Sequence, residues 1–356
     1  MSLEPMRIGL CEFVRELSRT PVIGRDFRIV GMASSFELPV KLYDHASGIG
    51  GTNPLVVTFH GGVNRDTRPI PVFQSTLAPC DGRATVLALA DPSLPLAPSL
   101  AQAWYAANAK APVPAIIAEM LDAVIAEIQP SRLIFASGSA GGHAALFHSF
   151  QHPDSVCIVQ NPLSCISRYE QRRISEYRQA CWPDLPADAP LSTVMQDDVG
   201  ELYRQGHRNS VIWLQNALDP LIPRQLAHFL RDIVARDKFL LLSEYFPNFA
   251  SHSYPRRVWA SWIEAAIEAS STSVSDIASV ASDLLAAIEG GRNDKPASML
   301  ESIDAGPMEI NSDQPVKEPA GNDIASPAES RVPNAERDKE IAQQIFAWSV
   351  TGSRGR

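Results

Sequence analysis

The stretch Phe135-Ala-Ser-Gly-Ser-Ala-Gly-Gly-His143 decides the fold. It continues the apolar run at residues 132–135 and precedes an alanine-rich segment that is typical of a helix. A nucleophilic serine on a sharp strand-to-helix turn needs small residues two positions before and after it, and Ser137 and Gly141 stand there. We therefore expect Ser139 to be a nucleophile, with serine at 137 replacing the usual glycine. The simpler alternative is a tight loop between two elements.

A second glycine motif lies upstream, at the end of another predicted strand. The segment Pro54-Leu-Val-Val-Thr-Phe59 has the composition of a buried strand and runs into His60-Gly61-Gly62. An α/β-hydrolase takes one backbone N–H of its oxyanion hole from this place. We expect Gly61 and Gly62 to supply that group and Ala140 to supply the other. A plain turn at the strand exit is the alternative.

Two further candidates each follow a predicted strand downstream of the serine. The apolar run at residues 210–215 leads into Asp219, and the run at residues 239–245 is followed by His252. Serine, aspartate and histidine in this chain order are the α/β-hydrolase order of roles, whereas other serine-hydrolase folds use other orders. We expect Asp219 to be the orienting acid and His252 to be the general base.

Each of these two residues also has a simpler explanation. Asp219 precedes a proline and would suit an ordinary turn, and His252 would suit a polar surface loop. His228 is a competing base. Its surroundings have a helical pattern, however, and a histidine in mid-helix would point to the flank of the sheet rather than to its C-terminal edge.

These residue types belong together because a serine hydroxyl is a poor nucleophile near neutral pH. An imidazole takes its proton, a buried carboxylate fixes the tautomer of that imidazole, and backbone N–H groups stabilise the oxyanion. Such chemistry needs neither a metal nor an organic cofactor, and we expect none.

Charge is distributed unevenly along the chain. Residues 271–356 carry 14 acidic and 8 basic side chains, whereas residues 1–270 carry 26 and 23. A nearly balanced core without a Lys/Arg block offers no surface for nucleic acid. We expect an N-terminal segment over 1–26 and, over 27–270, an α/β-hydrolase domain with a mostly parallel, doubly wound sheet. The remaining residues are expected to form a largely disordered acidic tail with short helices.

No segment has the pattern of a membrane span or an export signal. Charges interrupt the amino terminus before a signal-peptide core forms, and no apolar run approaches the ~20 residues that a membrane span needs. The expected location is therefore the cytoplasm. The five cysteines are an odd, widely spaced set without a C-x-x-C pair, so the sequence indicates neither a disulfide framework nor a zinc site.

Two stretches between predicted strands are expected to shape the substrate pocket. Trp104 and Tyr105 are candidates for the pocket mouth. Residues 163–209 separate two strands by far more than the usual loop, which predicts a helical cap over the active site. The alternative is that the aromatic and basic residues of this stretch form only an amphipathic packing helix; they are Tyr169, Arg172, Arg173, Tyr177 and Trp182.

A family resemblance rests on four short strings, which are Asp91-Pro-Ser-Leu, Ala103-Trp-Tyr-Ala, Gln160-Asn-Pro-Leu-Ser and Leu214-Gln-Asn-Ala-Leu-Asp219. Over roughly residues 27–265 the chain resembles the α/β-hydrolase-like proteins associated with capsular polysaccharide synthesis and with accessory Sec export of glycoproteins. The resemblance implies the three catalytic roles given above and acyl-ester chemistry on sugars. Ser137, and Ser251 in place of a glycine before His252, depart from the family pattern.

We therefore expect a serine hydrolase that cleaves, or transfers, an acyl group such as acetyl through an acyl-Ser139 intermediate, on a small-molecule or glycan ester. A carboxylesterase, lipase or thioesterase with a lipophilic substrate is the second hypothesis. The third is a non-catalytic hydrolase-fold component of a glycan or export assembly, in which the acidic tail binds a protein partner.

Overall fold

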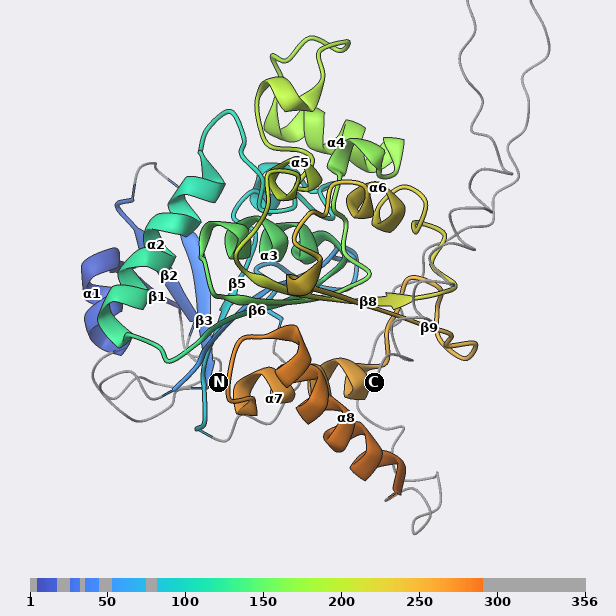
Figure 1. Ribbon diagram of the computed structural model, residues 1–356. Helices are drawn as coiled ribbons and strands as arrows, with labels where there is room; N and C mark the ends of the chain where they lie inside the picture. The colour runs from blue at the N-terminus through green and yellow to red at the C-terminus, as the bar shows by residue number, and fades with distance from the viewer. Residues whose placement is uncertain (1–4, 18–25, 33–35, 45–52, 75–81, 291–356) are drawn as a thin grey trace, which may run out of the picture. The chain divides into compact units, whose positions relative to one another are not determined.

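A computed structural model of the chain describes residues 5–17, 26–32, 36–44, 53–74 and 82–290 (Figure 1). Within these ranges the strands form one sheet, in the order β1-β2-β3-β5-β4-β6-β7-β8-β9. The strands are β1 (Met6–Gly9), β2 (Asp26–Val30), β3 (Leu38–Asp44), β4 (Leu55–Phe59), β5 (Thr85–Leu89), β6 (Leu133–Gly138), β7 (Val156–Gln160), β8 (Ser210–Asn216) and β9 (Phe239–Glu244).

The sheet is parallel except at β3, which runs antiparallel to both of its neighbours. Every residue of β4, β5 and β8 is buried, as expected of parallel strands covered on both faces. From β4 the chain steps outward to β5 and then returns to β6 on the other side of β4. Such a reversal opens a crevice at the carboxyl ends of the strands. The glycine loop after β4 and the serine turn after β6 therefore meet there.

Helices cover both faces of the sheet. The helix α3 packs on β4, β6 and β7, while α7 and α8 lie on the opposite face (Figure 1). The helices are α1 (Leu10–Leu17), α2 (Val113–Ile128), α3 (Ser139–Gln151), α4 (Gln171–Cys181), α5 (Gly200–Tyr203), α6 (Leu226–Leu230), α7 (Arg256–Glu268) and α8 (Val274–Gly290), with short 3-10 turns η1 (Leu94–Leu96), η2 (Ile166–Arg168), η3 (Leu191–Thr193) and η4 (Arg236–Lys238). No helix in the described ranges is long and apolar enough to cross a membrane.

The expected boundary at residue 26 is wrong, because the N-terminal segment is part of the domain. The strand β1 pairs in parallel with β2 and extends the sheet by one edge strand. Phe13 of α1 is fully buried and makes an edge-to-face contact with Phe27. A strand of four residues at an edge shows almost no periodicity in sequence, which explains why the sequence pattern missed it.

The expected boundary at residue 270 is also wrong. The compact unit extends to Glu289. Ile277 and Ala281 of α8 are completely buried, in the same hydrophobic cluster as the buried residues of α7. Alanine and serine dominate this helix, so its composition resembled that of the tail although one face is apolar. The expectation of a largely disordered acidic tail with short helices over the rest of the chain falls outside the described residues.

The insertion between β7 and β8 contains η2, α4, η3 and α5. Ile174 and Tyr177 of α4 pack with Trp104 and with Ala140 of α3 in one buried cluster, so the insertion covers the amino end of α3. On its outer side Arg172 and Arg173 both pair with Glu176. The contacts of α4 are those of the amphipathic packing helix, and the cap over the active site stays a prediction.

Candidate active site

Ser139 lies on the expected turn, at the first residue of α3, with a backbone φ of +51°. A residue with a side chain rarely adopts this conformation, and it persists only where the surroundings enforce it. The surroundings are tight: a Cβ added at Gly141 would lie 2.3 Å from the Phe59 carbonyl oxygen, and one added at Gly142 would lie 2.4 Å from Pro162. These two glycines are needed for close backbone approach.

Ser137, where the usual pattern has glycine, has a structural role of its own. Its buried hydroxyl accepts the N–H of Phe59 at 2.9 Å and donates to the Ala136 carbonyl at 2.7 Å. The same two residues, Phe59 and Ser137, are register partners across β4 and β6. The serine therefore joins the end of β4 to the turn, and its replacement of glycine leaves the geometry of the turn intact.

The structure brings the three predicted triad residues together. His252 Nε2 lies 3.0 Å from Ser139 Oγ, and His252 Nδ1 lies 2.9 Å from Asp219 Oδ2. All three are buried, with 8%, 9% and 5% of Ser139, His252 and Asp219 exposed. In the neutral imidazole the serine hydroxyl donates to Nε2 and Nδ1–H donates to the carboxylate, which is the arrangement that general-base catalysis requires.

The carboxylate of Asp219 is held from two other directions. Its Oδ1 accepts the N–H of Leu221 at 2.9 Å, and its Oδ2 accepts the side-chain amide of Gln215 at 3.2 Å. That amide is itself fixed, because Trp213 donates to its oxygen and its nitrogen also donates to Asn161. Hydrogen bonds of this kind orient a catalytic carboxylate before substrate arrives.

Asn216, for which the sequence predicted no role, connects the turn at Asp219 to the loop that carries His252. Its Oδ1 accepts the N–H of Leu218 at 3.0 Å, and its Nδ2 donates to the carbonyl of Ser253 at 3.0 Å and to that of Ala250 at 3.4 Å. The residue is completely buried. The available signal was the pair Gln215-Asn216 at the end of an apolar strand, where two buried amides call for specific partners.

The predicted oxyanion-hole residues also meet at this edge. A Cβ at Gly141 would lie 2.7 Å from the His60 carbonyl oxygen, so the loop of Gly61 and Gly62 packs directly on the start of α3. Ala140 is the second residue of that helix, where backbone N–H groups have no partner inside the helix. Donors from the two segments are thus available beside Ser139.

The ring of His60 holds the loop of Gly61 and Gly62 in place. Its Nδ1 lies 2.6 Å from the carbonyl oxygen of Gly61, and its Nε2 accepts the N–H of Asp91 at 3.1 Å. This pairing requires a neutral ring that carries its proton on Nδ1. Burial lowers the pKa of His60 to about 4, only partly opposed by the bond to Gly61, which keeps the ring neutral.

The expectation that Trp104 and Tyr105 stand at the pocket mouth is wrong. They are only 1% and 2% exposed, and they line a small cavity together with His143 and Met195. The Tyr105 hydroxyl accepts the N–H of His60 and donates to the Leu89 carbonyl, both at 2.8 Å. Tyr105 therefore supports the loop of Gly61 and Gly62 from inside the protein, and an aromatic pair in sequence could not reveal this.

The competing histidine, His228, does not approach Ser139. It lies on α6 and pairs with Asp198 through Nε2. Of the two histidines considered as the base, the one that meets the serine in the structure is His252.

Comparison with known proteins gives structural likeness only. No family model and no curated protein matches the sequence. An S-formylglutathione hydrolase from Agrobacterium tumefaciens is similar, with 15% identity, 67% of this chain and 91% of that chain covered, and a TM-score of 0.48. A capsule O-acetyltransferase of Neisseria meningitidis serogroup A shares 10% identity over 68% and 98% of the two chains, with a TM-score of 0.44.

A third similar structure is the glycosylation-associated protein complex Gap123 from Streptococcus agalactiae, with 14% identity, 63% and 43% of the two chains covered, and a TM-score of 0.42. The fold is assigned from the chain's own features, which are the strand reversal at β4, the antiparallel strand β3 and the serine turn after β6. The chain has the α/β-hydrolase fold.

Proposed function

We propose that this protein is a serine hydrolase that cleaves acyl esters through an acyl-Ser139 intermediate. The observation that carries the proposal is the continuous set of contacts from Ser139 Oγ through His252 to Asp219, at 3.0 and 2.9 Å. These distances lie within the range that proton transfer between a nucleophile and its base needs.

The reaction follows from this geometry. His252 Nε2 takes the hydroxyl proton as Ser139 Oγ attacks the ester carbonyl, and N–H groups of Ala140 and of the Gly61-Gly62 loop receive the oxyanion. The leaving alcohol departs with the proton that His252 carries, and the acyl group remains on Ser139. Water then attacks the acyl-enzyme by the same route and releases the acid. Attack by a second alcohol instead of water would transfer the acyl group.

The site favours an ester whose acyl group is short. The side chains around Ala140 leave little space, because it belongs to a buried cluster with Trp104 and Leu163, which are exposed by 1% or less. A long acyl chain would have to displace these buried side chains, at a cost of several kcal/mol for large apolar groups, whereas an acetyl group would not.

For the alcohol moiety of the ester, a sugar is favoured. Tyr245 and Phe249 are 66% and 47% exposed, and both lie in the segment between β9 and His252. Exposed aromatic rings are costly in water and present flat apolar faces on which a sugar ring can stack. The family resemblance in the sequence points to the same substrate class.

The first test is intact-mass analysis after reaction with a fluorophosphonate. We expect one adduct per chain on the wild type and none on Ser139→Ala, because only an activated serine reacts rapidly with this probe. Hydrolysis of p-nitrophenyl acetate should fall to the residual level in the same variant. A wild-type protein that neither labels nor hydrolyses would support the third hypothesis, a non-catalytic component.

Substrate class is tested separately. Acetylated monosaccharides and p-nitrophenyl esters of increasing chain length are compared by kcat/KM. We expect the acetyl esters to be best and the long-chain esters to be poor. The reverse order would favour the lipase-like alternative.

A further inference from the structure

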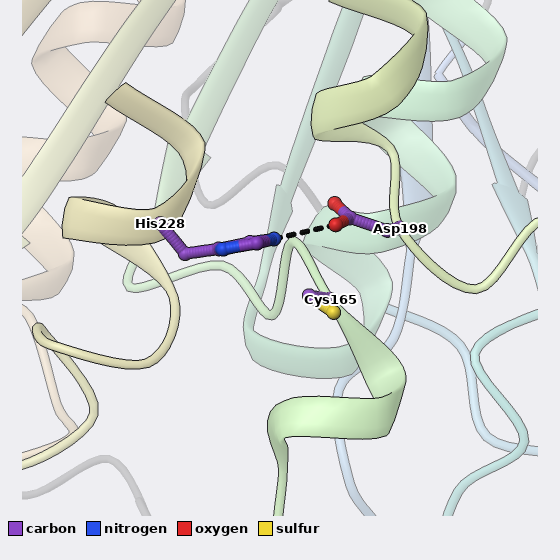
Figure 2. Close-up of side chains that lie close together, drawn as sticks. All are labelled: Cys165, Asp198 and His228. Carbon is purple, nitrogen blue, oxygen red and sulfur yellow. Dashed lines mark hydrogen bonds and ion pairs between the residues drawn. The ribbon is translucent and has the colours of Figure 1, made fainter. Parts of the chain in front are cut away.

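Three side chains that commonly bind metals meet at the base of the cap. Cys165 lies between β7 and η2, Asp198 lies two residues before α5, and His228 lies on α6. One ligand atom from each, a sulfur, a carboxylate oxygen and an imidazole nitrogen, lies within 4.8 Å of the other two. Figure 2 shows the three side chains converging from separate segments of the chain.

We infer that Cys165, Asp198 and His228 form a binding site for a divalent transition metal, with zinc as the favoured ion. A thiolate, an imidazole and a carboxylate are the donors that zinc accepts, at about 2.0–2.3 Å each. Three protein ligands leave the fourth position of a tetrahedral ion to water. The site is separate from the triad and does not depend on the proposed hydrolysis.

The order of the three groups excludes a second catalytic triad. The carboxylate of Asp198 contacts the Nε2 of His228, and Figure 2 marks no contact between that imidazole and Cys165. The Nε2 atom already faces the acid, so the imidazole is not placed to take the thiol proton.

Two of the ligands are held in place before any ion arrives. The side-chain amide of Gln225 accepts the backbone N–H of Cys165 at 2.8 Å and donates to the carbonyl of the same residue at 3.0 Å. The other carboxylate oxygen of Asp198 accepts the N–H of Gly200 at 2.9 Å. Groups that fix the ligands in this way strengthen metal binding because less freedom is lost when the ion binds.

The charge around the cluster also favours a cation. The charges of Asp198 and Glu201 both act on Asp197, so three acidic groups share this region. A divalent ion would neutralise this excess of negative charge.

Arg231 opposes the ion. Its guanidinium contacts Nδ1 of His228, whereas metal binding at Nε2 places a proton on Nδ1. Because Arg231 is exposed, its side chain can turn into solvent when the ion binds. The arginine therefore weakens binding without preventing it, and removing it should strengthen binding.

The position of the site defines what the ion would do. Cys165 begins the cap insertion, Asp198 stands near its end, and His228 belongs to the helix that follows the Asp219 turn. An ion bound by all three would fasten both ends of the cap to the part of the domain that carries the acid. Binding free energy at such a site adds to the stability of the folded state.

The test uses the full chain, reduced and freed of metal by a chelator, and titrated with Co²⁺ and then with Zn²⁺. We expect one Co²⁺ per chain, with the absorption band of a cobalt–thiolate bond, and displacement of Co²⁺ by Zn²⁺. Cys165→Ser should lose that band, whereas Cys181→Ser, which changes a buried cysteine outside the cluster, should keep it. His228→Gln should weaken binding at least about tenfold, and Arg231→Ala should tighten it several-fold.

Circular dichroism in chelator shows whether each variant is folded. If Cys165→Ser does not fold, the opposite shifts of His228→Gln and Arg231→Ala still test the site. The inference is overturned if the wild type binds no Co²⁺ stoichiometrically, or if folded Cys165→Ser keeps the thiolate band. Ser139→Ala should bind metal like the wild type, so this result and that of the hydrolysis assay are independent.

Discussion

Replacing Asn216 by alanine should damage catalysis more than its effect on stability explains. The change removes the acceptor for the N–H of Leu218 and the donor to the carbonyl of Ser253, each at 3.0 Å. Each of these two part-buried groups left without a partner costs about 1–3 kcal/mol, so we expect a loss of about 2–6 kcal/mol in the free energy of unfolding. The loop that carries His252 would also lose a hydrogen bond that joins it to the turn at Asp219.

The expected catalytic effect follows from that lost tie. A displacement of about 1 Å in a catalytic group costs about 10²-fold in rate, or about 2.7 kcal/mol in barrier. We therefore expect kcat for a short acyl ester to fall by one to two orders of magnitude with KM little changed. Fluorophosphonate labelling of Ser139 should slow in parallel, because labelling depends on the same base.

Asn209→Ala is the matched control. Asn209 is equally buried and donates to Ser149 at 3.0 Å and to Tyr203 at 3.1 Å, but it lies at the opposite end of β8 from Asn216. Urea unfolding should show a comparable loss of stability in both variants, and kcat should fall only in Asn216→Ala. Equal kinetic effects in the two folded variants would refute the positioning role of Asn216.

Three further predictions concern the base, the C-terminal boundary and acid. His252→Ala should lower kcat/KM nearly as much as loss of the nucleophile; an unaffected His252→Ala beside a damaging His228→Ala would disprove the assignment of the base. A chain ending at residue 270 loses the buried face of α8 and should unfold about 2–4 kcal/mol more easily in urea, whereas a chain ending at 290 should match the wild type. Acidification from pH 6.5 toward 4 should lower the melting temperature, because the unfolded chain binds protons in this range that folded, buried histidines do not. Asp91, whose pKa burial raises to about 6, partly offsets this loss by binding a proton in the folded state, and a melting temperature that is constant over the range would contradict the scheme. The histidines are His60, His143 and His148, whose pKa burial lowers to about 4, 4 and 3.

The fold and the grouping of the triad were predictable because each candidate follows its own strand. In a parallel sheet the carboxyl ends of the strands share one edge, so Ser139, Asp219 and His252 had to emerge on the same side. The small residues around the serine added a local steric requirement, which the close approach of Gly141 to the Phe59 carbonyl explains.

The supporting residues could not be predicted, because their partners come from distant parts of the chain. Gln215 meets Asn161 across two neighbouring strands, and Tyr105 reaches the loop at His60. Neither contact leaves a periodic signal. The cluster of Cys165, Asp198 and His228 could not be predicted for the same reason. Metal motifs are recognised in sequence by short spacings, and these three residues lie tens of residues apart.

The placement of α8 bears on how the chain is made. One face of the central strands is covered by α7 and α8, which are synthesised after every strand of the sheet. At usual translation rates the interval between completing β9 and completing α8 is on the order of seconds. During that time Ile212, Ile158 and Val56 lack the side chains that bury them in the finished protein. The nascent domain thus presents an uncovered apolar sheet, a surface that chaperones bind and that favours aggregation at high expression.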